Sequence, residues 1–233
     1  MIKTILILLL VTTFRVQALD LFKAEYTVFK DGKQIGNSSI ELSKDEQFYR
    51  ITDQTKGTHG MASFLGFKRS EETLFSESDG KFIPDSYHMK QKVAFNKRHS
   101  DYQVDAETQM IYGSHKGDAW QIKTPAMFLT PNLVSLRLFQ DICAGKTADL
   151  TYRVLKAEKV VDYHFKITSQ NDGIIEVDKI HSKPSRVTTT WLDTKQQCLP
   201  IKVYHLEEGE DVLETKLIKV SFNSSQTQPE KTL

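Results

Sequence analysis

Hydrophobic and polar residues alternate with a period of two along most of the chain, a pattern typical of β-strands with one buried face. Near the C-terminal end, Val187, Thr189 and Trp191 fall on one side of such a strand, and Thr188 and Thr190 on the other. Short polar connectors separate three segments of this kind, 186–192, 198–206 and 212–222. They predict an antiparallel meander.

The same alternation recurs towards the N-terminus. Leu21–Lys30 is a strand candidate, Asp31-Gly32-Lys33 is a hairpin turn, and 36–43 is the returning strand. Further candidates cover 46–54, 70–77, 86–95, 99–105, 109–114, 148–155, 160–169 and 174–181. About a dozen strands exceed what a flat open sheet tolerates. The sequence therefore predicts a mainly β protein, with one large curved antiparallel sheet or incomplete β-barrel.

One segment has helical rather than strand periodicity. Thr130 suits an N-cap and Pro131 the first helical position, while Gly145 suits a left-handed cap at the other end. The helix should pack against the concave face or one end of the sheet, because one side is apolar. The apolar positions are Leu133, Leu136, Phe139, Ile142 and Cys143, with Arg137, Gln140 and Asp141 expected away from them. No composition shift marks a boundary, so a single domain over 19–222 is expected.

The N-terminus has the form of a secretory signal peptide. A short positive segment, Met1–Lys3, precedes the apolar run Ile5–Val11 and the small-residue site Val16-Gln17-Ala18. We expect cleavage after Ala18, a periplasmic location and no transmembrane segment in the mature chain, since the apolar run is too short to span a bilayer. The polar segment 223–233 is expected to be a disordered tail.

Two cysteines, Cys143 and Cys198, fall within the expected mature chain. An oxidising compartment would allow them to form a disulfide. Spacing alone fixes neither distance nor geometry, so two buried free thiols are the alternative.

Charge and motifs narrow the function classes. The formal net charge of +1 gives no reason to expect nucleic acid as a partner. The seven histidines are scattered without metal-ligand spacing, and neither cysteine has a nucleophile context. Adjacent carboxylates such as Glu71-Glu72 would point to opposite faces of a strand. We therefore predict no catalytic residue, metal site or cofactor, and a protein that is not an enzyme.

A glycine-flanked apolar segment, 56–68, interrupts the strands. It is either a loop or one helical turn, and either a lid over a cavity or a segment packed on the core. Large apolar residues lining a half-open barrel would hold an acyl chain, whereas small barrels are normally filled by side chains. The candidate ligand-binding residues are Phe64, Leu65, Phe67, Trp120, Phe128 and Trp191.

A basic cluster follows the strand candidate 86–95. Lys90, Lys92, Lys97, Arg98 and His99 could meet phosphate head groups or an acidic partner. The alternative is a solvated strand face and turn.

Several landmarks occur in an order that resembles a known family. They are the signal peptide, Phe22-x-Ala24-x-Tyr26, Arg69-Ser70-Glu71, Asp79-Gly80-x-x-x-Pro84-x-x-Tyr87, Leu133–Leu136 with Gly145, Trp191-Leu192-Asp193 and Leu199-Pro200-Ile201. Over roughly 19–222 this is similar to the bacterial envelope family called domain of unknown function 3108. The resemblance implies a Gram-negative periplasmic protein whose curved antiparallel sheet wraps a helix, as in the incomplete β-barrels of periplasmic lipoprotein carriers. The resemblance implies no catalytic residues. This chain departs from the family pattern at Asn132, where an acidic residue is expected before the helix. The cysteine pair cannot be assigned to the family.

Two functions follow as hypotheses. The first is a periplasmic protein that binds a hydrophobic or amphiphilic envelope component, namely a lipid, an acyl chain or a glycan. The second is a structural or assembly factor that offers a sheet edge or its basic cluster to another envelope protein.

Overall fold

The computed structural model describes residues 19–45 and 47–223, and the expected signal peptide and residues 224–233 lie outside these. Asn223, expected to begin the tail, is instead the last residue of a strand. The strands are β1 Leu21–Lys30, β2 Lys33–Asp45, β3 Phe48–Gly57, β4 Lys68–Ser78, β5 Lys81–Val93, β6 Asn96–Asp105, β7 Met110–His115, β8 Asp118–Lys123, β9 Thr151–Lys156, β10 Lys159–Asn171, β11 Ile174–Ile180, β12 Arg186–Asp193, β13 Leu199–Glu207 and β14 Leu213–Asn223. The helices are α1 Gly60–Phe64, α2 Leu133–Cys143 and a short 3-10 helix, Thr194–Gln196.

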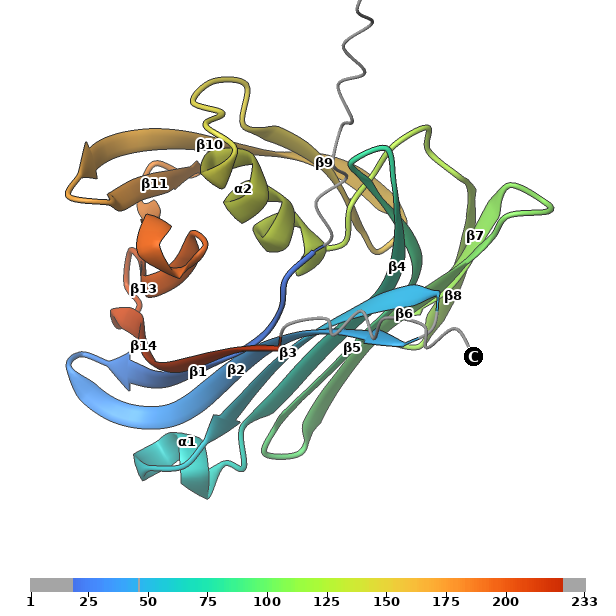
Figure 1. Cartoon of the computed structure of the whole chain (residues 1–233). Helices are drawn as coiled ribbons and strands as arrows, with labels where there is room; N and C mark the ends of the chain where they lie inside the picture. Colours follow the sequence, from blue (N-terminus) through green and yellow to red (C-terminus); the bar gives the residue numbers. More distant parts are fainter. Residues whose placement is uncertain (1–18, 46, 224–233) are drawn as a thin grey trace, which may run out of the picture.

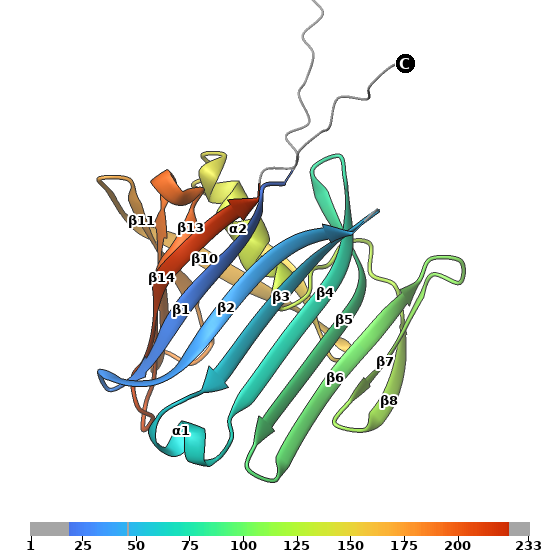
Figure 2. The ribbon, with the colours of Figure 1, turned by 60° about the horizontal axis from the view of Figure 1, so that its bottom comes forward.

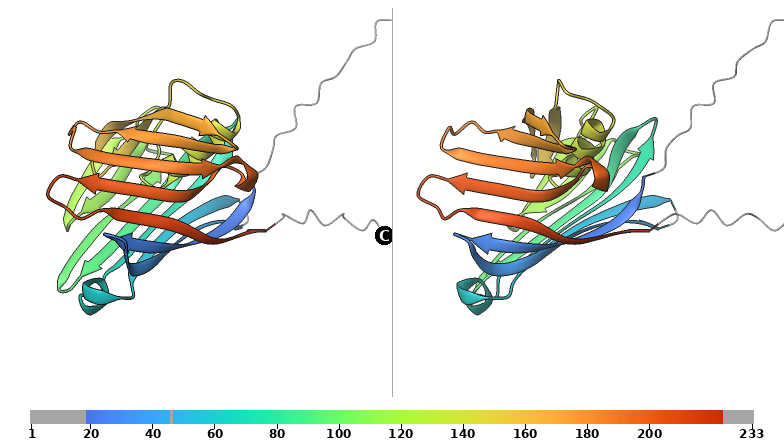
Figure 3. Two further views of the ribbon diagram at one scale, coloured as in Figure 1. Left: turned by 90° about the vertical axis from the view of Figure 1, so that its left-hand side faces the viewer. Right: turned by 60° about the vertical axis from the view of Figure 1, so that its left-hand side comes forward.

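All fourteen strands belong to one antiparallel sheet. Its order runs from β8 back to β1, then to β14, and back to β9, so β8 and β9 are its two edges. The sheet curls around α2, which lies inside the curve (Figure 1). β10 to β14 form a side-by-side meander with hairpins at both ends (Figure 3). The predicted curved, mainly β architecture with a central helix is confirmed, and the sheet is not closed.

The β9 edge is covered by the segment that leads from β8 to α2. Leu129 N donates to Arg153 O, and Leu155 N donates to Leu129 O, both at 2.9 Å. Leu129 thereby forms a parallel bridge with Val154. This contact satisfies part of a strand edge that would otherwise be free to pair with another chain.

The start of α2 differs from the prediction. The helix begins at Leu133, two residues after Pro131, and Thr130 Oγ1 accepts from Leu133 N at 3.1 Å. Thr130 and Asn132 instead share a buried hydrogen-bonded network with Thr73 of β4. Pairing with the sheet thus holds the polar side chains that precede the helix. At the other end Gly145 has a φ of +85°, as predicted for a left-handed cap.

Asp141 of α2 was expected on the solvent side, and this expectation was wrong. The residue is 6% exposed, and its Oδ2 accepts from the Tyr152 hydroxyl at 2.8 Å. Arg137 forms an ion pair with its other oxygen at 2.6 Å. A carboxylate with these partners can be buried without a large desolvation penalty.

The apolar core lies between α2 and the inner face of the sheet. Leu133 and Phe75 have no exposed surface, and Ile51 has 2%. Cys143 at the end of α2 is joined by a disulfide to Cys198, which directly precedes β13, with 5.7 Å between the Cα atoms. The helix is therefore fixed to the sheet by apolar packing along its length and by a covalent bond at its C-terminal end.

Candidate functional site

Strand pairing sorts the residues of β1 to β6 into rows that cross the sheet. Directly opposed residues on antiparallel strands point to the same face, and successive rows alternate between the inner and outer faces. The row nearest α2 on the inner face is mostly apolar: Phe22, Leu42, Ile51, Thr73, Tyr87 and Tyr102. The inner rows farther along the strands become polar, beginning with Asp53 and Glu71 and continuing with Arg69.

These polar rows enclose a chamber of about 230 Å³. Arg69 and Glu71 form an ion pair within it, and Arg69 Nη1 donates to Gln91 Oε1 at 2.9 Å. The opposite wall is supplied by Pro200 and Val203 of β13 and Thr215 of β14, and the remaining lining residues are Tyr26, Ser38, Ile40, Asp53 and Thr55.

An acidic group and a basic group of the interior, Asp53 and Lys179, have pKa values shifted towards neutrality. Burial raises the pKa of Asp53 to about 7, with the Arg69 charge opposing it, and its Oδ1 has no hydrogen-bond partner among the described residues. Burial lowers the pKa of Lys179 to about 8, and the nearby positive charges of Lys156 and Arg186 act in the same direction. The Lys179 ammonium lies 3.2 Å from the centre of the Tyr163 ring.

The chamber is small, and ionisable side chains line part of its wall. Pockets for drug-sized ligands occupy about 300–1,000 Å³ and are mainly apolar, whereas this one contains three charged side chains. An acyl chain would have to desolvate the Arg69–Glu71 ion pair, which is costly. This chamber is therefore a poor fit for a lipid chain.

The outer face of the same strands carries a row of four lysines. Lys56, Lys68, Lys92 and Lys97 stand directly opposite one another on the adjacent strands β3, β4, β5 and β6. Adjacent strands lie about 4.8 Å apart, so four ammonium groups follow one another over about 15 Å of the sheet. All four residues are exposed, and we call them the lysine row.

Nothing in the described part of the chain forms an ion pair with the lysine row. The next outer row adds Lys90 and His99 and contains only one acidic residue, Glu25. Like charges directly opposite on a sheet destabilise it, so this arrangement costs folding free energy. It produces a concentrated positive potential that attracts anions.

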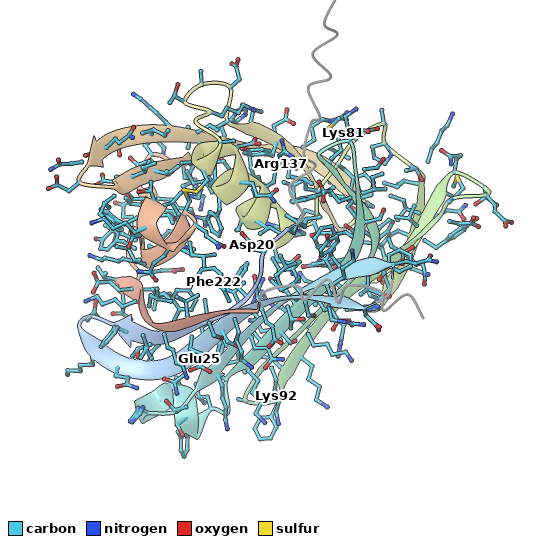
Figure 4. The ribbon with its side chains drawn as sticks, viewed as in Figure 1. Asp20, Glu25, Lys81, Lys92, Arg137 and Phe222 are labelled. Carbon is cyan, nitrogen blue, oxygen red and sulfur yellow. A yellow bond between two sulfur atoms is a disulfide. The ribbon has the colours of Figure 1, made fainter. Side chains whose placement is uncertain are left out.

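A groove of about 770 Å³ runs along this outer face. It contains the lysine row, Lys90 and His99, together with polar side chains of β2 to β4 such as Asn37 and Gln54. Lys92 lies on the side of the sheet that faces away from α2 (Figure 4). The lysine side chains therefore lie on the outer face, while the groove and the interior chamber share Tyr26, Ser38, Thr55 and Arg69 as lining residues.

Exposed apolar side chains stand at the strand ends beside the lysine row. Met61 and Phe64 of α1 are 66% and 82% exposed, and Phe95 of the β5–β6 turn is fully exposed. The two connections lie next to each other at one end of the sheet (Figure 2), where Ala94 N donates to Leu65 O at 2.6 Å. We call Met61, Phe64 and Phe95 the apolar tip.

Close packing holds α1 against the end of β3. A Cβ atom at Gly57 would lie 2.4 Å from the Ala62 carbonyl oxygen, so only glycine permits this approach. Gly60 and Gly66, on either side of the helix, have positive φ values of 54° and 59°. The segment 56–68 is thus one helical turn between glycines, and its position at the strand ends is fixed by the backbone.

The structure does not bring the six predicted ligand-binding residues together. Phe64 is at the apolar tip, with Leu65 and Phe67 partly buried beneath it. Phe128 and Trp120 pack together in a small core cluster on the β5–β8 side. Trp191 points outwards, where its Nε1 donates to Glu176 at 2.9 Å and the Lys202 ammonium lies 4.6 Å from the centre of its ring.

Part of the basic surface was not predicted. Lys90, Lys92, Lys97 and His99 are in the outer groove, but Lys56 and Lys68 join them only through strand pairing. Arg98 belongs to the other face, because it lies opposite Gln91 in the row that contains Arg69. Phe95 was missed because it was expected to end the strand 86–95, whereas β5 ends at Val93 and Phe95 lies in the turn that follows.

Within residues 19–45 and 47–223, no three or more His, Cys, Asp or Glu side chains are arranged to hold a metal ion. The same residues contain no helix that is both long and apolar enough to cross a membrane.

Comparison with known proteins identifies the fold. No family model and no curated protein matches the chain. A solved structure similar to it is a β-barrel-like protein of domain of unknown function 1849 from Brucella abortus, with a TM-score of 0.55 and 12% identity. The match covers 89% of this chain and 99% of that one. The shared feature is a β-barrel-like fold that occurs in a family of unknown function.

Proposed function

We propose that the protein is a non-enzymatic component of the cell envelope that binds an anionic amphiphile on its outer face. The observation that supports this is the position of the lysine row directly beside the apolar tip. An anionic amphiphile carries a negative head group and an apolar chain on one molecule, and this surface presents a complement to each.

Two further considerations favour this function. The lysine row and the apolar tip both cost free energy in the isolated protein, and an anionic amphiphile would relieve both costs at once. The signal-peptide pattern before Leu19 supports a periplasmic location, and that compartment is bounded by lipid membranes. We retain membership of the domain of unknown function 3108 family as part of this proposal, on the landmarks given above.

Isothermal titration calorimetry with lysophosphatidylglycerol, kept below its micelle concentration, tests the proposal. We expect saturable binding, no binding of zwitterionic lysophosphatidylcholine, and loss of most of the affinity in Lys68→Gln/Lys92→Gln. The matched control is Lys81→Gln/Lys159→Gln, which removes the same charge from two exposed lysines outside the lysine row. Equal binding by both double variants would contradict the proposal.

A second candidate function is that of an assembly factor, favoured by the β8 edge. β8 pairs only with β7, and the edge of Asp118–Lys123 can accept a strand from another protein. A photo-crosslinking residue in place of exposed Gln121 would capture such a partner in intact envelopes. Crosslinks from Gln121 but not from exposed Ile83, far from this edge, would support this role.

A further inference from the structure

We infer that the protein binds the amphiphile as part of a bilayer surface. The apolar tip inserts among the lipids, and the lysine row contacts their phosphates. This inference rests on the proposed function and names its partner, an anionic lipid membrane to which the protein binds peripherally.

The apolar tip is the first observation. Large exposed apolar residues elsewhere, such as Ile83, Tyr112 and Ile180, lie on separate strands, and isolated residues of this kind are common on protein surfaces. Met61, Phe64 and Phe95 instead gather on two connections that are hydrogen-bonded to each other. These two connections lie at the strand ends (Figure 2), and exposed apolar residues at the end of a sheet are placed to enter a membrane interface.

The distance between the lysine row and the apolar tip is the second observation. Lys92 precedes Phe95 by three residues, and Lys68 follows Phe64 by four. A strand rises about 3.3 Å per residue, so the ammonium groups stand back from the apolar tip by roughly the distance between lipid phosphates and the upper acyl chains. Apolar side chains placed below cationic ones match the order of layers in an anionic membrane surface.

Acidic residues replace the unpaired lysines farther from the apolar tip. Four residues along the strands from the lysine row, about 13 Å away, an outer row contains Glu41, Glu72 and Asp101, with Lys23 as its only cation apart from His88. Lys23 pairs with Glu41 at 3.1 Å and Arg50 pairs with Glu72 at 2.8 Å, so Asp101 is the carboxylate of this row that has no ion-pair partner among the described residues. A protein standing on its apolar tip would hold this acidic row away from the phosphates, so the charge gradient favours the same orientation.

The exposure of the apolar tip argues for a bilayer over a single extracted lipid. Phe95 is fully exposed and Phe64 nearly so, and neither forms the wall of the outer groove. A single acyl chain covers only part of side chains this exposed, and their full burial requires a medium that surrounds them. The groove itself is lined mainly by polar and charged residues, which suit head groups.

Quenching by brominated lipids measures insertion directly. Phe95→Trp is compared with Ile83→Trp, an exposed control near the other end of β5, where Lys81 lies far from Lys92 (Figure 4). The wild-type protein is measured in parallel, and its signal is subtracted to remove the fluorescence of Trp120 and Trp191. With vesicles of phosphatidylglycerol and acyl-brominated phosphatidylcholine we expect quenching of Phe95→Trp alone, and none on vesicles without phosphatidylglycerol. Absence of quenching at Phe95→Trp, or equal quenching at both positions, would overturn the inference.

Vesicle co-sedimentation gives the matching affinity. Lys68→Gln/Lys92→Gln should bind phosphatidylglycerol vesicles roughly thirtyfold more weakly, and Lys81→Gln/Lys159→Gln should bind like the wild type. Phe64→Ser/Phe95→Ser should also bind weakly, although its folding is unaffected because both side chains are exposed. If soluble lysophosphatidylglycerol binds but vesicles do not, the bilayer inference fails while the proposed function stands. If neither binds, both fail.

Discussion

The two ends of the sheet differ in how their polar, charged and aromatic side chains are accommodated. At the α2 end, the inner rows are buried under the helix, and Thr73, Thr130 and Asn132 are hydrogen-bonded to one another. At the other end, four lysines face one another without ion-pair partners among the described residues, and Phe95 is fully exposed. Both ends are built from the same strands, so local propensity does not explain the contrast.

The difference shows that groups unfavourable to folding, namely opposed like charges and exposed aromatic rings, are placed at the end of the sheet away from α2. A packed and covalently fixed α2 end stabilises the whole sheet, and the outer end can then hold like charges and exposed aromatic rings. Natural proteins depart from favourable local choices mainly at functional sites. The Asp53 layer lies between the two ends and is intermediate in character, because it is partly buried and incompletely hydrogen-bonded.

The largest predicted effect is at the α2 end. Leu133→Ala removes a fully buried side chain and should lower the free energy of unfolding by about 3–5 kcal/mol. Phe64→Ala removes a larger side chain that is 82% exposed, and the expected change is under about 0.5 kcal/mol. Urea denaturation of both variants measures the contrast, and similar losses would abolish it.

The disulfide should come next. Cys143→Ser/Cys198→Ser opens a loop of 55 residues and should lower the free energy of unfolding by about 2–4 kcal/mol. Wild-type protein with a reducing agent is the control and should match the variant. Lipid binding at the far end should be unchanged in the folded variant, which calorimetry checks.

The Asp53 layer predicts a pH dependence. Its folded pKa of about 7 lies above the unfolded value near 3.9, so between these values the folded state holds more protons than the unfolded state. Asp53 therefore makes stability fall as pH rises from about 4 to 7, by at most about 1.4 kcal/mol per pH unit. Asp53→Asn should remove this contribution, seen as a flatter plot of unfolding free energy against pH. If the slope of that plot is the same in Asp53→Asn as in the wild type, the pKa of Asp53 is not raised in the folded protein.

The smallest effect is expected at the lysine row. Lys68→Gln removes repulsion from Lys56 and Lys92 and should raise the free energy of unfolding by up to about 1 kcal/mol at low ionic strength. The gain should vanish in 1 M salt, where the screening length is about 3 Å. Lys81→Gln should show no such gain in thermal unfolding. A variant that gains stability and loses lipid binding would tie the repulsion to function.

Much of the fold could be predicted because its signals are local. Period-two alternation identified most strands, and the apolar face of 133–143 with Gly145 identified α2. The start of the helix was wrong because Thr130 and Asn132 pair with Thr73, which is 57 residues away from Thr130. Asp141 was wrong for a similar reason, since Tyr152 supplies the partner that permits its burial.

The amino-acid sequence by itself determined the elements, the sheet's need to curl and the residue types available for binding. Only the tertiary structure decided which face each strand presents and which strands are neighbours. Trp191 points outwards because the adjacent Leu192 packs in the core, and a strand with apolar residues on both faces does not reveal this locally. The lysine row exists because pairing brings Lys56 and Lys68 beside Lys92 and Lys97, and register is set by contacts between strands rather than within them.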